Sequence, residues 1–290
     1  MTLRTISALF VSMTLSFATF AVDKVIYGDD DRLDIFEASN GLHLELAKST
    51  AAMISHSKLI SNDDGTTTVT GSSLESRGIC KTAKFSEQLT SANCSGFLVG
   101  KDLLVTAGHC IRSKRDCQAS AWVFDFAVEN ADDNAASVPT TSVYKCVEII
   151  ERDLNRGTQD DYALIRLERE VTDREPLTFR TEGKVEVGTP LVVIGHPTGL
   201  PTKIAAGAIV RENTRGTYFQ SNLDTFGGNS GSAVFNSETG VIEGILVRGE
   251  TDYVYDSTQG CRVPKVCTNE GCRGEDVTRI TNIKALGNNK

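Results

Sequence analysis

The segment from Cys94 to Cys110 constrains the fold of this chain more than any other, because it joins two apolar runs to one histidine. The runs 97–99 and 103–105 are separated by a short turn that contains glycine, a pattern that predicts a β-hairpin. Such a hairpin would bring the two cysteines together. A disulfide between them would then hold His109, which directly precedes Cys110, in a fixed position.

Two later segments supply groups that can act together with a histidine. Asp161 stands at the head of the strand-like run 162–167, and Ser230 lies in the glycine-rich turn 227–231. A serine hydroxyl is a poor nucleophile at its own pKa, so an imidazole must take its proton during attack on a carbonyl. A buried carboxylate fixes the imidazole tautomer and stabilises the resulting cation. His109, Asp161 and Ser230 are therefore the candidate catalytic residues.

The serine turn also offers donors for the negative charge of a tetrahedral intermediate. We expect the backbone N–H groups of Gly228 and Ser230 to form this oxyanion hole. The turn departs from the G-x-S-x-G pattern of lipases, because Ser232 stands where the last glycine belongs. Taken singly, each of these residue types is also common in turns and on surfaces. Their combination, in the chain order His, Asp, Ser, favours the catalytic interpretation.

The motifs Val105-Thr106-Ala107-Gly108-His109-Cys110 and Gly228-Asn229-Ser230-Gly231-Ser232 resemble those of the chymotrypsin-like serine proteases, in particular the bacterial branch that includes the glutamyl endopeptidases. The segment 25–32 is similar to the mature N-terminus of those bacterial enzymes. The resemblance implies an all-β fold of two six-stranded antiparallel β-barrels with the active site in the cleft between them. The barrels would span about 25–167 and about 177–290 of a trypsin-like protease domain.

One position departs from the animal digestive proteases of this superfamily. Those enzymes carry an aspartate just before the nucleophile, which pairs with the amine freed on activation, whereas Asn229 stands here without a charge. Cleavage between Lys24 and Val25 would therefore free an amine that has another partner or no role.

The start of the chain has the features of a secretory signal. Residues 1–21 contain a basic residue, the apolar run 6–20 and Ala21 at a suitable cleavage point. The apolar run is short for a membrane span, and no other segment approaches one. We interpret 22–24 as a short propeptide. The mature protein, 25–290, is expected outside the cytoplasm, secreted or periplasmic, without membrane association.

The cysteines agree with an oxidising compartment, because all eight follow the signal and form an even set. The hairpin predicts the pair Cys94–Cys110. Cys117–Cys146 is a second expected pair, since both residues flank strand-like segments of the same half. Three pairings stay open for the remaining four, Cys80, Cys261, Cys267 and Cys272. Their spacing does not favour zinc, and we expect neither a metal nor a cofactor.

Substrate preference depends on the residues around the nucleophile. Asp224 stands six positions before Ser230, and in trypsin-like relatives an aspartate there forms the base of the primary pocket and pairs with Arg or Lys. The alternative is that Asp224 bonds to backbone and faces away. We expect the strand end Leu246, Val247, Arg248 and Gly249 to bind substrate. Glutamyl endopeptidases carry a histidine at the position of Leu246, so its absence argues against a preference for glutamate. Arg248 would either neutralise Asp224 or receive an acidic side chain of the substrate.

The sequence thus predicts a secreted serine endopeptidase that acts on protein or peptide substrates through an acyl-enzyme, with a preference for Arg or Lys at P1. Two alternatives stay open: a catalytically silent homologue that binds proteins through the same cleft, and an esterase with the same triad. The net charge of −8 argues against nonspecific nucleic-acid binding. We expect a monomer. The polar region 55–80 is interpreted as a surface loop or hairpin insertion.

Overall fold

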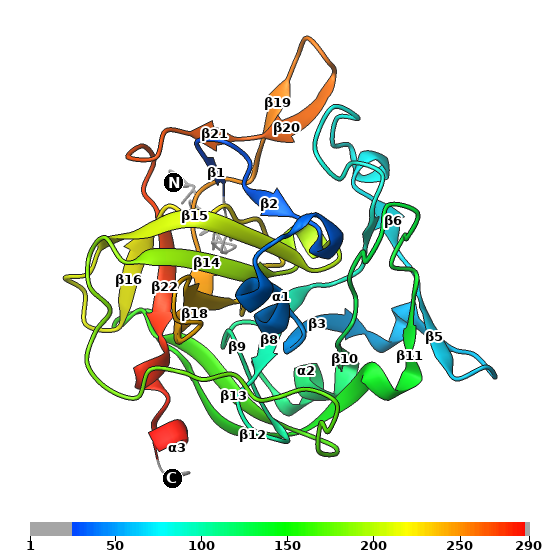
Figure 1. Ribbon diagram of the computed structural model, residues 1–290, viewed down its shortest axis with the longest axis horizontal. Helices are drawn as coiled ribbons and strands as arrows, with labels where there is room; N and C mark the ends of the chain where they lie inside the picture. Colours follow the sequence, from blue (N-terminus) through cyan, green and yellow to red (C-terminus); the bar gives the residue numbers. More distant parts are fainter. Residues whose placement is uncertain (1–24, 288–290) are drawn as a thin grey trace, which may run out of the picture.

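The structure is a computed structural model that describes residues 25–287 (Figure 1). The predicted signal peptide and propeptide lie outside the described residues. Strands are the main regular structure of the chain, and twelve of them close into two six-stranded antiparallel barrels. The all-β double barrel that the resemblance implied is therefore confirmed.

The first barrel closes in the order β10-β12-β13-β9-β8-β3. The predicted hairpin is β8 and β9, with Phe97 opposite Val105. Large apolar side chains, among them Trp122 and Phe97, fill the interior. The strands of this barrel are β3 (Thr50–Ser55), β8 (Cys94–Leu98), β9 (Leu103–Thr106), β10 (Ser120–Val123), β12 (Val143–Leu154) and β13 (Asp161–Leu167).

The second barrel follows the order β14-β17-β18-β22-β16-β15 and is closed by pairing of β15 with β14. A short strand near the start of the chain, β2 (Arg32–Leu33), adds to β15. The strands of this barrel are β14 (Pro190–Gly195), β15 (Lys203–Glu212), β16 (Tyr218–Ser221), β17 (Ala233–Asn236), β18 (Ile242–Arg248) and β22 (Glu275–Arg279).

One apolar cluster joins the two barrels. Phe97 and Leu164 of the first barrel belong to the same buried cluster as Ile194, Phe235 and Ile245 of the second. Burial of apolar surface between packed elements is the main favourable term in folding, so this shared core fixes the barrels against each other. Any site that takes residues from both barrels therefore has a rigid frame.

Short sheets and helices decorate the barrels. The hairpin of β4 and β5 falls within the region 55–80, so this region is the hairpin insertion that the sequence suggested. The remaining strands are β1 (Ile26–Tyr27), β4 (Leu59–Ser61), β5 (Thr66–Val69), β6 (Ser72–Ser73), β7 (Leu89–Thr90), β11 (Ser137–Pro139), β19 (Tyr253–Asp256), β20 (Cys261–Pro264) and β21 (Val266–Cys267). The helices are α1 (Gly41–Ala47), α2 (Lys114–Ala119) and α3 (Lys284–Gly287), with 3₁₀ turns η1 (Ile35–Glu37), η2 (His56–Lys58), η3 (Glu75–Arg77), η4 (Thr140–Ser142), η5 (Pro197–Gly199) and η6 (Ile280–Asn282).

The largely apolar run 121–127 continues beyond the strand that it begins. The strand ends at Val123 because Asp125 adopts the left-handed φ of 61°. The Asp125 carboxylate accepts two hydrogen bonds from the guanidinium of Arg174, both at 2.9 Å. A tertiary ion pair therefore overrides the local strand pattern.

Four disulfides link all eight cysteines. Cys94–Cys110 and Cys117–Cys146 form as expected. The open pairings are resolved as Cys80–Cys261 and Cys267–Cys272. Cys80–Cys261 ties the insertion to the hairpin of β19 and β20, which lie side by side in Figure 1.

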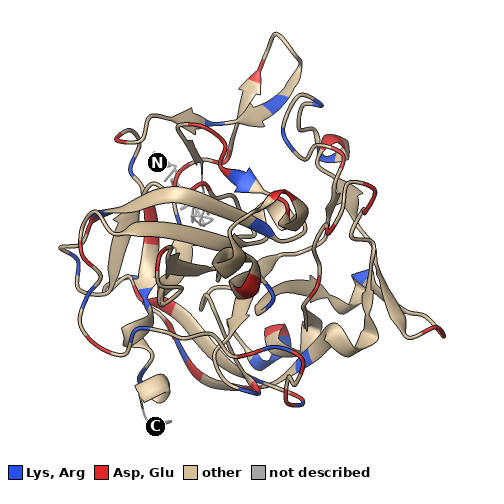
Figure 2. Cartoon of the chain, in the orientation of Figure 1, with Lys and Arg blue, Asp and Glu red and all other residues tan. Residues whose placement is uncertain are grey.

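Basic and acidic residues are mixed along the loops and strands of the chain (Figure 2). Within residues 25–287, no helix has the length and apolar character that crossing a membrane requires.

Candidate active site

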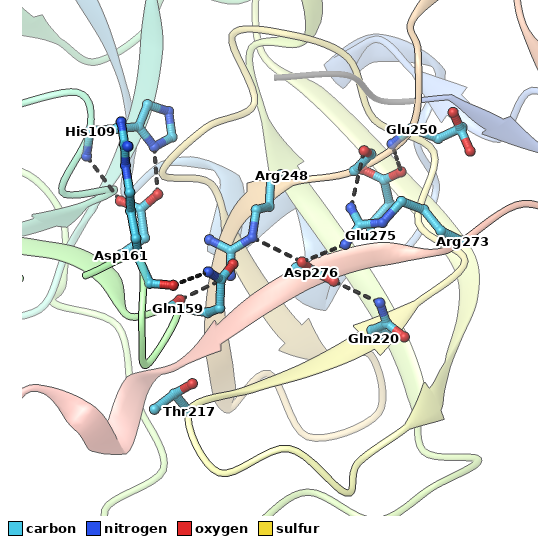
Figure 3. A network of polar contacts seen from close by, with 12 residues as sticks. His109, Gln159, Asp161, Thr217, Gln220, Arg248, Glu250, Arg273, Glu275 and Asp276 are labelled. Carbon is cyan, nitrogen blue, oxygen red and sulfur yellow. Dashed lines mark hydrogen bonds and ion pairs between the residues drawn. The ribbon is translucent and has the colours of Figure 1, made fainter. Parts of the chain in front are cut away.

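His109 and Asp161 meet through two hydrogen bonds at one end of the first barrel. The backbone N–H of His109 donates to Oδ1 of Asp161 at 2.9 Å, and Nδ1 of the imidazole lies 2.7 Å from Oδ2 (Figure 3). The Asp161 side chain is 5% exposed and that of His109 is 16% exposed. The carboxylate thus fixes both the loop and the ring, and an Nδ1–H tautomer leaves Nε2 as the base.

The histidine loop packs closely on the neighbouring hairpin because Gly108 has no side chain. A β-carbon at Gly108 would lie 2.2 Å from the carbonyl oxygen of Asp153 and 2.7 Å from that of Tyr162. Arg152 reinforces this contact, since its Nε donates to the Gly108 carbonyl at 2.9 Å. The Ala-Gly-His sequence therefore places the imidazole directly over the first residue of β13.

Ser230 belongs to the turn 226–231, here called the nucleophile turn, which comes from the second barrel. Ser230 is 3% exposed, and its carbonyl accepts a hydrogen bond from the backbone N–H of Ser95 at 2.8 Å. Ser95 follows Cys94, whose disulfide partner Cys110 follows His109. The nucleophile turn is thus hydrogen-bonded to strand β8, and the disulfide Cys94–Cys110 links this strand to the loop that carries His109.

The two expected oxyanion donors lie in peptide units whose carbonyls are held from the other side. The carbonyl of Gly227 accepts from Thr198 N–H at 2.5 Å, and that of Asn229 accepts from Ser232 N–H at 2.8 Å. In a trans peptide the N–H points away from the C=O. The N–H groups of Gly228 and Ser230 are therefore directed away from Thr198 and Ser232, as an oxyanion hole requires.

A cavity of about 390 Å³ opens beside the imidazole, and we call it the active-site cavity. His109 and Asp161 line it together with Val247 and Arg248 of the predicted substrate-binding strand end. Arg248 is held in place, because its Nε donates to Asp276 at 2.9 Å and its Nη2 to the carbonyl of Gln159 at 2.9 Å (Figure 3). The guanidinium therefore pairs with Asp276, and the suggested neutralisation of Asp224 by Arg248 is wrong.

Leu246 takes a different place from the one expected. Its side chain is fully buried in the core of the second barrel, so the expectation of a substrate contact by this side chain is wrong. Its backbone supports the nucleophile turn instead: the carbonyl accepts from Gly231 N–H at 2.8 Å, and the N–H donates to Ser232 at 3.0 Å.

Asp224 requires a second correction. Its Oδ1 accepts the backbone N–H of Tyr27 at 2.7 Å and its Oδ2 that of Asp31 at 2.9 Å. Burial, together with the nearby charges of Asp30 and Asp31, raises the pKa of this carboxyl to about 7. Asp224 thus anchors the start of the described chain, as in the alternative interpretation.

Sequence reasoning missed Glu275, the first residue of β22. Its side chain is fully buried, accepting from Thr225 Oγ1 at 2.7 Å and from the backbone N–H of Glu250 at 3.2 Å. A β-carbon on Gly249 would lie 1.9 Å from Oε2 of Glu275, so this carboxylate lies directly against the end of the substrate-binding strand. The segment after Glu275-Asp276, Val277-Thr278-Arg279, is not an apolar run, so the sequence carried no clear signal for this carboxylate.

Metal-type ligands gather at one point among the described residues: Cys94, His109 and Cys110. Both sulfur atoms form the Cys94–Cys110 disulfide, so neither is a thiolate that can bind a metal. The fully buried His196 lies apart from this group. Burial lowers its pKa to about 3, and its ring stacks on Phe126 at 5.8 Å, in keeping with a structural role.

This combination of a double β-barrel with a His-Asp pair from one barrel and a serine turn from the other defines a chymotrypsin-like serine protease fold. The family model described as "Trypsin-like peptidase domain" matches residues 94–245, more than half of the chain, and the protein belongs to this family. No curated protein matches the chain in sequence.

A solved structure shows the same fold. A Glu endopeptidase in complex with MPD superposes with a TM-score of 0.54 at 17% identity, covering 91% of this chain and 98% of that one. A protease from M. tuberculosis in its active form gives a TM-score of 0.48 at 13% identity, with 95% and 92% covered. A serine endoprotease from Yersinia pestis gives 0.49 at 13% identity, with 87% and 68% covered.

Proposed function

We propose that this protein is a secreted serine endopeptidase that cleaves peptide bonds through His109, Asp161 and Ser230. The observation that carries the proposal is the pair of hydrogen bonds by which Asp161 holds both the backbone and the ring of His109. The docking of the nucleophile turn on Ser95 supports it further. Four disulfides support a compartment outside the cytoplasm.

The proposed reaction uses each group in turn. Nε2 of His109 takes the proton of Ser230 Oγ as the oxygen attacks the carbonyl carbon, and Asp161 stabilises the imidazolium. The N–H groups of Gly228 and Ser230 bind the developing oxyanion; one such donor typically contributes about 3 kcal/mol to lowering the barrier. The imidazolium then protonates the leaving amine as the C–N bond breaks. Water, deprotonated by His109, hydrolyses the acyl-enzyme.

We further propose that substrates carry Arg or Lys at P1 and that Glu275, rather than Asp224, is the carboxylate that receives this side chain. Glu275 lies between Thr225, which precedes the nucleophile turn, and Gly249 at the end of the substrate-binding strand. A carboxylate in this position would form a charge-assisted hydrogen bond with a basic side chain.

Digestion of a denatured protein mixture tests both statements. The protein beginning at Val25 is incubated beside Ser230→Ala, and every new terminus is mapped by mass spectrometry. We expect cleavage after Arg and Lys by the active protein alone. No difference from Ser230→Ala would contradict the endopeptidase proposal.

Two variants then show which carboxylate, Glu275 or Asp224, determines the preference at P1. Glu275→Gln is expected to lose the preference for basic P1 residues, whereas the matched variant Asp224→Asn is expected to retain it. Cleavage after Glu by the unmodified protein would instead assign specificity to Arg248.

A further inference from the structure

A separate cavity of about 280 Å³ borders the nucleophile turn at Gly227 and Gly228 and shares no lining residue with the active-site cavity. Lys58, Ser72 and Arg77 of the hairpin insertion 55–80 form much of its wall, so we call it the insertion cavity. The insertion therefore reaches the nucleophile turn, although the sequence pattern indicated only a surface loop or hairpin there.

Two positive charges meet in the insertion cavity. Nζ of the half-buried Lys58 donates to the carbonyl of Ser91 at 3.0 Å, and Nη1 of Arg77 donates to the carbonyl of Thr198 at 2.9 Å. Because both side chains line the same cavity, their charges repel each other. In keeping with this, burial, and then the charge of Arg77, lower the pKa of the Lys58 ammonium. An anion between them would relieve this repulsion.

Among the residues that line the insertion cavity, Asp252 carries one negative charge, whereas Lys58 and Arg77 carry two positive charges. Oδ2 of Asp252 accepts a hydrogen bond from the backbone N–H of Gly227 at 2.9 Å and thus supports the nucleophile turn. The cavity keeps a net positive charge in a protein whose formal net charge is −8.

Arg77 is connected to the nucleophile turn through Thr198 and to the hairpin of β19 and β20. Thr198, which accepts from Arg77, donates its own N–H to Gly227 at 2.5 Å. The carbonyl of Arg77 accepts from Nη2 of Arg262 on β20 at 2.5 Å, and the disulfide Cys80–Cys261 joins the same two segments. A charge held in this way loses little conformational entropy on binding a partner.

The position of the cavity indicates which part of a substrate enters it. In the proposed function the acyl half of the substrate lies along Val247 and Arg248 in the active-site cavity. The carbonyl oxygen of the cleaved bond points to the N–H groups of Gly228 and Ser230. The leaving-group half must then extend from Ser230 past Gly227 and Gly228, where the insertion cavity begins.

We propose that the insertion cavity binds an acidic side chain on the leaving-group side of the cleaved bond, at the first or second residue after it. This inference rests on the proposed function. Lys58 and Arg77 would pair with the substrate carboxylate, and Ser72 and Thr90 line the same space.

Internally quenched peptides test the inference. They share one acyl half chosen from the mapped cleavage sites and carry Glu, Gln or Lys at each of the two positions after the cleaved bond. We expect kcat/KM for Glu to exceed that for Gln by about 3- to 10-fold, and Lys to be the poorest. Raising the salt from about 0.02 M to about 0.5 M should shrink this preference.

Charge variants identify the groups responsible. The double variant Lys58→Met/Arg77→Gln should bring the Glu-to-Gln ratio to about 1. Arg77→Lys should keep most of the preference, because it retains the charge. Arg215→Gln removes the same charge from an exposed site in the second barrel and should leave the ratio unchanged. Thermal unfolding of each variant checks that it folds.

Equal kcat/KM values for Glu and Gln in the unmodified protein, or a preference that survives the double variant, would overturn the inference while cleavage itself continues. Loss of all turnover, together with no labelling of Ser230 by a phosphonate, would overturn the proposed function and the inference with it.

Discussion

At the scale of single residues, the candidate triad depends on Asp161. This side chain could be predicted from sequence because it opens an apolar strand downstream of a histidine between cysteines. The second hydrogen bond of Asp161, from the backbone N–H of His109, could not be predicted from sequence. It depends on the close packing of the histidine loop against β12 and β13, which the absence of a side chain at Gly108 allows. The choice between the two interpretations of Asp224, and the position of Glu275 against Gly249, could not be predicted either, because only the fold decides them.

Asp161→Asn should therefore abolish most activity without unfolding the protein. The amide is nearly isosteric, but it favours the wrong tautomer of His109 and does not stabilise the imidazolium. We expect kcat to fall by about 10³- to 10⁴-fold, as is typical for this change in a Ser-His-Asp triad. Peptide turnover and the thermal midpoint are the measurements. A fall of less than about tenfold would argue that Asp161 does not orient the catalytic base.

Gly231 tests the docking of the nucleophile turn. It has a φ of 89°, and a β-carbon there would lie 2.1 Å from the carbonyl oxygen of Ser95. Gly231→Ala should displace Ser230 and lower kcat/KM by about 100-fold or more, because a small misplacement of catalytic groups is costly. Gly216→Ala is the matched control, since nothing lies within 4 Å of its β-carbon position. Equal activity of the two variants would contradict the described packing.

At the scale of elements, the hairpins and most strands follow from apolar runs between glycine-containing turns. The N-terminal strand β1 was not among the predicted strands, because its two residues, Ile26 and Tyr27, are held by partners far along the chain. Tyr27 N–H bonds to Asp224, and the carbonyl of Val25 accepts from Thr225 N–H at 3.1 Å. Pairing of Cys80 with Cys261 is equally nonlocal, with a separation of 181 residues. Contacts of this kind leave no periodic signature in the sequence.

The anchoring of the N-terminal strand by Asp224 predicts a pH dependence. The pKa of this buried carboxyl is raised to about 7 from 3.8, so the folded protein holds a proton that the unfolded chain releases between these values. Asp224 should therefore make the free energy of unfolding fall as pH rises from about 4 to about 7, by at most about 1.4 kcal/mol per unit.

Denaturant unfolding of the unmodified protein and of Asp224→Asn across this pH range measures the contribution of Asp224 as a difference. Other groups titrate in both proteins, so only this difference is diagnostic. A difference that is constant with pH would contradict the raised pKa.

At the scale of the whole molecule, the candidate site depends on how the two barrels pack against each other. His109 and Asp161 come from the first barrel and Ser230 from the second, and one apolar cluster together with the Ser95–Ser230 bond holds them in register. The double barrel could be predicted only through the resemblance of short motifs to a known superfamily. The insertion cavity could not, because the insertion, the nucleophile turn and the hairpin of β19 and β20 meet only in the fold.

The central claim is that Ser230 is a nucleophile activated by His109. The most direct test is covalent labelling of the protein beginning at Val25 with a fluorophosphonate, followed by mass spectrometry of the intact protein and its peptides. We predict a single adduct on Ser230, absent from Ser230→Ala and formed at least about 100-fold more slowly in His109→Ala. A folded protein that forms no adduct, or forms it elsewhere, would contradict the account.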